Sequence, residues 1–150
     1  MPAVLPRHLP MIGLMVDTKI KNWQDALYAK IEEFNARPFA WGTHDCCTFA
    51  ADCVMAVTAV DKMAAYRGGY SNAQGAARKI KKAGGLDIAL TKELGEPLAI
   101  TAMAQRGDVV CFTSALGDTA GICVGSMIAA AGLDGVTYTP MVQAFKAWRI

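Results

Sequence analysis

The strongest constraint on the fold is a change of periodicity near Gly95. Before this glycine, apolar residues recur at spacings of three and four, as they do along one face of a helix. After it, short runs of small and β-branched apolar residues are separated by Gly and Asp, which is typical of strands. Helices followed by strands predict an α+β fold, with a helical layer packed on a small antiparallel sheet.

Four helices are expected before Gly95, each bounded by a polar cap, a glycine or a proline. Their expected ranges are 23–36, 46–60, 72–83 and 86–94, with Asn22, Asp45 and Ser71 as the caps of the first three. In the second helix, Phe49, Cys53, Ala56, Val57 and Val60 share the face expected to lie in the core.

Strands are expected at 107–113, 119–132 and 135–140, where apolar runs are bounded by turn residues. The segments 107–113 and 119–125 are expected to pair as antiparallel strands. The C-terminal segment 141–150 is expected either to close the sheet or to lie across it.

Length and composition predict one globular domain preceded by a short arm. The 150 residues are 53% hydrophobic and 19% charged, which is enough apolar material for a single core. Residues 1–20 contain Pro2, Pro6 and Pro10 and are expected to form an extended arm. Residues 21–150 are expected to form the domain.

Charge and hydropathy argue against several classes of partner. The net charge of +2 is too balanced to indicate a nucleic-acid or anionic-lipid partner, and the basic cluster at 78–82 is expected to be the solvated face of a helix. No apolar run reaches the ~18 residues of a membrane span. Neither a basic leader nor a cleavage site for a signal peptide is found, so we expect synthesis in the cytoplasm. The five cysteines, an odd number, are expected to be free thiols.

The segment WGTHDCCTFAADCV, residues 41–54, places Cys46 at the expected start of a helix. At that position the unpaired amides and the helix dipole lower the pKa of a thiol and favour the thiolate. A nucleophilic thiol also needs a base, usually an imidazole that is held by a third polar group. Cys46 alone is therefore compatible with a nucleophile and with a small side chain buried at the helix start.

Three segments in order resemble a known family. HDCCTFAADCV (44–54), RGDVVCF (106–112) and TAGICVG (119–125) resemble the NlpC-type cysteine peptidases of the papain-like superfamily, which cleave peptidoglycan stem peptides. Residues 37–150 are also similar to NlpC-like proteins of uncharacterised function that are encoded by tailed phages, in which PFAWG, YRGGYS and a terminal AWR recur in this order. The resemblance implies a papain-like, NlpC-like architecture.

Residue by residue, the resemblance assigns Cys46 to the nucleophile and Gly107–Asp108 to the pair that opens a strand. The catalytic histidine of the family would fall at position 119, which is Thr119 in this chain. The chain's two histidines, His8 and His44, both precede Cys46. A threonine cannot act as a general base near pH 7, and loss of a triad base lowers the rate by several orders of magnitude. The resemblance therefore implies the fold, but the residue at 119 argues against hydrolysis.

Two alternative chemistries involve the same cysteines. In the first, His44 or His8 is a surrogate base and the protein is a cysteine peptidase or amidase that cleaves peptidoglycan stem peptides with Cys46 as nucleophile. The second is a zinc site, but the Cys-x2-Cys spacing that presents two thiolates to one ion is missing. We therefore expect no metal, no cofactor and no disulfide. Trp41, in the loop before Cys46, is expected to line any cleft.

The favoured function is implied by the resemblance alone. It is a structural or interaction component of a tailed-phage tail, near the tail tip, with other tail proteins of the tail-tip hub or distal tail as partners. The chain is then expected in the tail of the virion after synthesis in the bacterial host, and peptidoglycan is a ligand only under the peptidase alternative. A peptidase requires an imidazole within about 4 Å of the Cys46 sulfur, directly or through one water.

Overall fold

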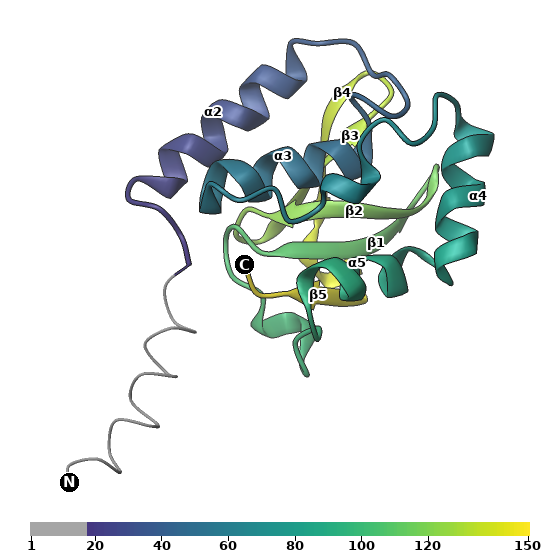
Figure 1. Ribbon diagram of the computed structural model, residues 1–150. Coiled ribbons are helices and arrows are strands. Elements are labelled where there is room, and N and C mark those ends of the chain that lie inside the picture. The colour runs from purple at the N-terminus through teal and green to yellow at the C-terminus, as the bar shows by residue number, and fades with distance from the viewer. Residues whose placement is uncertain (1–17) are drawn as a thin grey trace, which may run out of the picture.

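The computed structural model describes residues 18–150, in which a helical layer packs on a five-stranded antiparallel sheet (Figure 1). This confirms the predicted α+β class. The helices are α2 (Trp23–Asn35), α3 (Cys46–Thr58), α4 (Ala73–Ala83) and α5 (Leu86–Leu94). The strands are β1 (Val109–Ser114), β2 (Gly117–Cys123), β3 (Met127–Gly132), β4 (Gly135–Pro140) and β5 (Lys146–Trp148).

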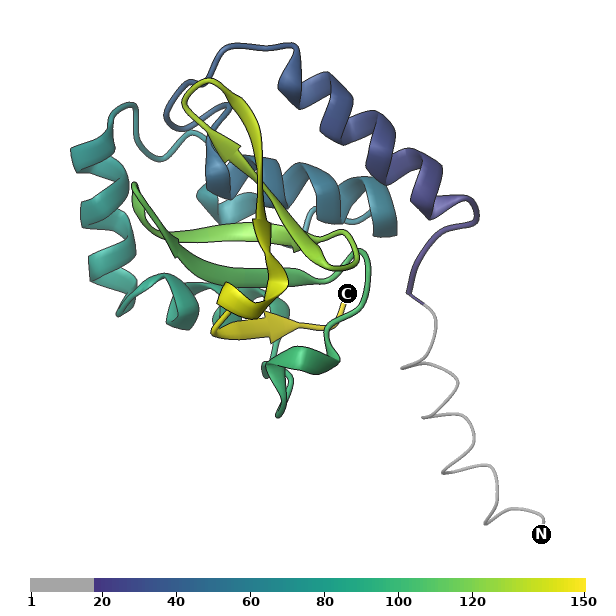
Figure 2. The same ribbon diagram turned by 180° about the vertical axis from the view of Figure 1, so that it is seen from behind.

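The sheet has the order β4-β3-β2-β1-β5. β1 and β2 pair antiparallel with Val109 opposite Ile122, which confirms the predicted pairing. The run 119–132, predicted as one strand, is instead divided between β2 and β3 by a turn in which Gly125 has a φ of 103°. β5 pairs with β1, so the C-terminal segment closes one edge of the sheet, as seen from behind in Figure 2.

Two of the predicted helix caps differ from those observed. α2 begins after Asn22, but that residue has a left-handed φ of 60° and its side chain makes no capping hydrogen bond. α4 is capped by Asn72, whose side chain accepts a hydrogen bond from the amide of Gly75, and not by Ser71. At the other end of α4, Gly84 adopts the left-handed conformation, as expected for a glycine that ends a helix.

α3 ends earlier than the hydrophobic pattern predicts. Its last residue is Thr58, and Ala59 is left-handed with a φ of 63°. Because the chain turns there, Val60 leaves the helical face and is 54% exposed, so its predicted place in the core is wrong. Phe49, Cys53 and Val57 are fully buried on that face, as predicted.

The sheet carries an apolar surface on each side. Side chains such as Val109, Ile122 and Trp148 pack against α2, α3 and α5 in the main core. The opposite side, which includes Val110 and Phe112, is covered by the chain around Leu98, Ala104, Met141 and Ala144. Alternation along each strand thus fills two apolar layers.

Both ends of the described chain are tied to the domain. The amide of Ile20 donates to the carbonyl of Val57 over 2.9 Å, and Lys19 Nζ donates to the carbonyl of Ile150 over 2.7 Å. Lys19 and Ile20, assigned to the arm from sequence, therefore contact the domain. Residues 1–17 of the predicted arm lie outside the described residues. Within residues 18–150, no helix is both long enough and apolar enough to cross a bilayer.

Candidate functional site

The start of α3 is held by a capping box around Asp45. The Asp45 carboxylate accepts hydrogen bonds from the amides of Thr48, over 2.9 Å, and Gly42, over 2.7 Å. In return, the Asp45 amide donates to the Thr48 hydroxyl over 2.7 Å. Asp45 is 1% exposed, so these bonds are shielded from water. They place Cys46 at the first position of the helix, as the sequence predicts.

Close packing of two loops shapes the entrance to α3. Gly42 has a φ of 87°, and a Cβ atom there would lie 1.9 Å from the carbonyl oxygen of Tyr70. The carbonyl of Gly42 accepts from the amide of Gly68 over 2.9 Å. Only glycine allows this approach, which joins the loop before Cys46 to the YRGGYS loop.

A cavity of about 290 Å³ opens at Cys46. Its lining residues come from the loop before α3, the start of α3, the β1–β2 hairpin and α4. Figure 1 shows the backbone arrangement of these elements. Trp41, predicted to line a cleft, is among the walls of the cavity. The other lining residues are Ala73, Ala76, Ala77 and Ile80 of α4, Leu116 and Asp118 of the hairpin, and Thr119.

The surroundings of Cys46 favour its thiolate. The pKa of this thiol is lowered, chiefly because the side chain of Cys47 hydrogen-bonds to its sulfur. The backbone amides of Ala120 and Cys47 act in the same direction, while burial and the charge of Asp45 oppose it. The sulfur therefore accepts from donors on both α3 and β2, which is how a protein stabilises a buried thiolate.

The pKa values of the other four cysteines are raised, in contrast to that of Cys46. Hydrogen bonding to Cys46, together with burial, raises the pKa of Cys47 well above its usual value. Burial also raises the pKa of Cys53 and Cys123, and raises that of Cys111 to about 12. All five thiols are free, and in the described part of the chain no three His, Cys, Asp or Glu side chains gather as metal ligands.

Thr119 lies in the cavity that contains Cys46. Its hydroxyl is engaged within the hairpin, 2.7 Å from the Ser114 hydroxyl and 2.9 Å from the carbonyl of Gly117, to which it donates. The position that would hold the family's histidine thus carries a hydroxyl turned to its own hairpin. Asp118, the other polar side chain of β2 that lines the cavity, accepts from the Thr113 hydroxyl over 3.2 Å.

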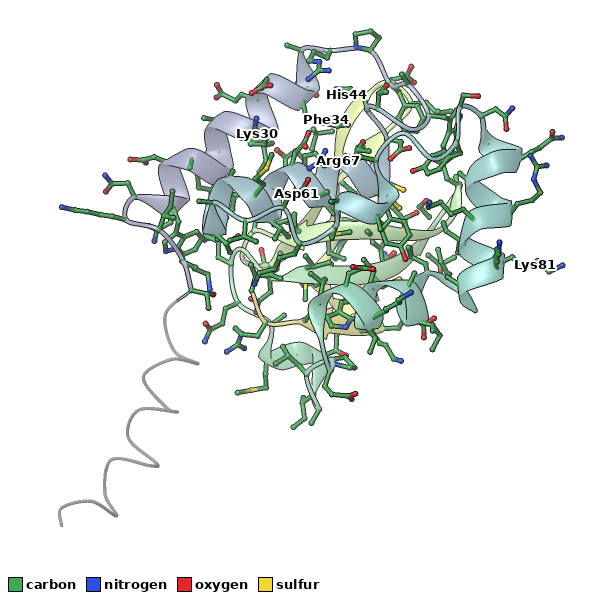
Figure 3. All side chains as sticks on the ribbon, viewed as in Figure 1. Lys30, Phe34, His44, Asp61, Arg67 and Lys81 are labelled. Atoms are coloured by element: carbon green, nitrogen blue, oxygen red, sulfur yellow. The ribbon has the colours of Figure 1, made fainter. Side chains whose placement is uncertain are left out.

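His44 is directed away from the cavity, toward α2 (Figure 3). Its ring stacks on that of Phe34 with centroids 3.4 Å apart, and its Nε2 lies 3.0 Å from the carbonyl of Phe34. Since a carbonyl only accepts, Nε2 carries the proton. The ring is 2% exposed, and packing against α2 keeps it from rotating toward Cys46. His44 therefore packs against α2 and is not among the residues that line the cavity at Cys46, where the peptidase alternative requires a base.

Several residues of the site were not identified from sequence. Tyr70 hydrogen-bonds to Asp45, and burial is the largest cause of its raised pKa. Arg67 of the same loop pairs with Asp52 at 2.7 Å and Asp61 at 2.9 Å, which fastens the loop to α3. These contacts join segments that are distant in the sequence, so a local pattern does not predict them. The sequence shows only that this loop contains aromatic and basic residues and two glycines.

The protein is thus an α+β protein in which a thiol with a lowered pKa lies in a cleft, and no histidine of residues 18–150 lines that cleft. The chain belongs to the family described as Domain of unknown function (DUF6950), whose model matches residues 18–150. No curated protein matches the chain. The match spans the helical layer and the sheet, and it covers the same residues that the structure describes.

Proposed function

We propose that this protein is a papain-like, NlpC-like module without hydrolase activity that serves as a structural or interaction component of a tailed-phage tail, near the tail tip. Other tail proteins of the hub or distal tail are its partners. The tail assignment rests on the sequence resemblance. The absence of hydrolysis rests on the geometry at Cys46.

One observation carries the loss of hydrolysis: the cavity at Cys46 holds Thr119 where a base is needed, and His44 is packed against Phe34. A thiolate alone does not complete hydrolysis. The leaving amine must receive a proton, and an activated water must then attack the acyl-enzyme. Among residues 18–150, His44 is the single histidine, and it does not line this cavity.

Exposed apolar side chains support a function in binding other proteins. Met103 and Val142 are exposed on two neighbouring 3-10 turns, Thr101–Met103 and Met141–Gln143. Ile100, just before the first turn, and Phe145, two residues after the second, are also exposed. The Thr101 hydroxyl donates to the carbonyl of Phe145 over 3.4 Å, which joins the two segments. Large apolar side chains clustered at a surface are typical of protein interfaces.

Two assays test this function. Purified protein incubated with peptidoglycan is expected to release no stem-peptide fragments above background. In a phage that lacks this gene, a copy carrying Cys46→Ser is expected to restore particle formation as the wild-type gene does. If particles form without the gene, the tail function is wrong.

The second candidate function is a cysteine peptidase or amidase, favoured by the lowered pKa of Cys46 and by the cavity at its sulfur. It requires stem-peptide release that disappears in Cys46→Ser and again in His44→Ala. His44 also packs on Phe34, so His44→Ala could lose activity through a structural change. The test therefore requires that the His44→Ala protein is folded and that its Cys46 thiolate still reacts with an alkylating reagent. That pair of results would assign the base to His44 and contradict the non-hydrolytic function.

A further inference from the structure

A second cavity, of about 520 Å³, lies between α4 and the loop that precedes it, and it shares no lining residue with the cavity at Cys46. Its cationic walls are Arg78, Lys79 and Lys82 of α4. The preceding loop and the first turn of the helix supply the rest: Gly69, Tyr70, Ser71, Asn72 and Gly75. We call it the basic cavity. Its volume is in the range of small-molecule sites, roughly 300–1,000 Å³.

The charge of the basic cavity is not neutralised within the described chain. No acidic residue occurs between Lys62 and Leu86, and none of the three cationic walls forms a salt bridge within residues 18–150. Arg67 of the adjoining loop differs, because it is paired with Asp52 and Asp61 (Figure 3). Lys79 and Lys82 also line an adjoining cavity, and Glu93 is the one carboxylate in the wall of that adjoining cavity. Three cations that converge on one hollow with no acid in its wall create a positive potential there.

Polar groups of neutral charge complete the wall. Ser71 and Asn72 line the cavity, and α4 begins there with Asn72 as its cap. The positive end of the helix dipole therefore adds to the field of the cationic side chains. Lys79 also lies over the Tyr66 ring, with Nζ 5.7 Å from the centroid, so its stem is supported on the protein surface.

From these observations we infer that the basic cavity binds a phosphate group of a small ligand, such as a sugar phosphate or a nucleotide. An arginine and two lysines match the charge and the acceptor geometry of a phosphate. An extended nucleic acid is a poorer match, because it requires a long track of cationic contacts, whereas the net charge of this chain is +2. The inference is independent of the Cys46 cavity and of the proposed tail function.

Lys81 provides a matched control on the same helix. It belongs to the same basic cluster but does not line the basic cavity, and it extends from the outer edge of α4 in Figure 3. Lys81→Gln removes the same charge as Lys82→Gln. If the basic cavity is a specific site, Lys82→Gln should weaken phosphate binding more than Lys81→Gln does. A diffuse electrostatic attraction predicts that both variants weaken binding equally.

The experiment is a titration of the full chain with pyrophosphate at physiological salt, followed by amide chemical shifts. Saturable shifts are expected at 69–75 and 78–82. The Kd is expected to rise about tenfold in Arg78→Gln and in Lys82→Gln, as for loss of a charge-assisted hydrogen bond. Lys81→Gln is expected to change it by less than about twofold. All three side chains are exposed, and the spectrum of each variant reports directly whether it remains folded.

Parallel titrations distinguish the sources of phosphate. Adenosine monophosphate is expected to compete with pyrophosphate for the same amides. A single-stranded oligonucleotide and phosphatidylglycerol vesicles are expected to bind no more tightly than pyrophosphate at this salt. The inference is overturned if pyrophosphate causes no saturable shift, if Lys81→Gln weakens binding as much as Lys82→Gln, or if only the oligonucleotide or the vesicles bind.

Discussion

Cys46 differs from the other four cysteines in its hydrogen bonds, and this difference makes its reactivity testable. It accepts from Cys47 and from the amide of Ala120, and these donors stabilise the thiolate. The remaining thiols all have raised pKa values. A small electrophile that enters the cavity meets the Cys46 sulfur beside Trp41 and Leu116.

We predict that limiting iodoacetamide modifies Cys46 first. Because its pKa is lowered, the thiolate forms at lower pH than in an ordinary cysteine, so the rate of modification should rise with pH and reach half its maximum at a lower pH than that of a free cysteine peptide. Peptide mass spectrometry of the native protein identifies the modified residue. Cys46→Ser should remove the fast phase, and prior modification of Cys111 or Cys53 would contradict the prediction.

At the scale of the element, the start of α3 depends on one buried carboxylate. Asp45 caps the helix and also accepts from the amide of Gly42. Asp45→Ala is expected to lower the free energy of unfolding by about 3 kcal/mol, because it removes a cap and leaves the buried Gly42 amide without an acceptor. Urea denaturation measures this change. Asp45→Asn keeps one acceptor oxygen and should lose less, so equal losses in the two variants would show that the charge matters more than the cap.

The pairing of β2 with β3 depends on a residue without a side chain. A Cβ atom at Gly121 would lie 2.5 Å from Ile128 Cγ2 and 2.9 Å from the carbonyl oxygen of Ala129. Gly121→Ala is expected to destabilise the protein by about 2 kcal/mol through overpacking. Gly117→Ala is the control, because no atom lies within 4 Å of its added Cβ and only its φ of 96° opposes the change. A loss in Gly117→Ala that matched or exceeded the loss in Gly121→Ala would contradict this explanation.

At the scale of the whole molecule, Asp108 ties the C-terminus to the sheet. This fully buried carboxylate accepts from the amides of Gln105 and Ile150 and from Arg149 Nε, each within 3.0 Å. Asp108→Ala is expected to lower the free energy of unfolding by about 3 kcal/mol, since three donors lose their acceptor. Arg149→Ala leaves both amide bonds in place and should lose about 1 kcal/mol. Thermal or urea unfolding separates the two values, and a larger loss in Arg149→Ala would contradict this order.

The exposed apolar side chains near the two 3-10 turns can be substituted without disturbing the core, so their effect on binding can be measured separately from any effect on stability. Val142 is 88% exposed, so Val142→Glu should change the free energy of unfolding by less than about 0.5 kcal/mol. If this surface contacts another tail protein, the same substitution should reduce particle formation in the complementation assay, because it would bury a carboxylate. Val60→Glu, at a 54% exposed site on the loop after α3, is the matched control. Equal effects of the two variants on particle formation would argue against a specific interface at Val142.

The order of helices and strands could be predicted from local sequence patterns, because caps, turns and periodicity depend on neighbours in the chain. Asp45 caps α3 through Thr48, three residues away, and Gly84 ends α4 through its own backbone conformation. The exposed Val60 shows the limit of such patterns: the periodicity continues beyond Thr58, but a left-handed Ala59 ends the helix.

Contacts between side chains of different elements could not be predicted in this way, because they depend on how the elements pack. Cys46 and Thr119 share a cavity because β2 packs against α3, and His44 turns from that cavity because Phe34 of α2 offers it a stacking surface and a carbonyl. The basic cluster of α4 illustrates the same point. Its charge is evident in the sequence, but Lys82 lines a cavity and Lys81 does not. Contacts between distant segments depend on how the elements pack, and a local pattern of residues does not encode that geometry.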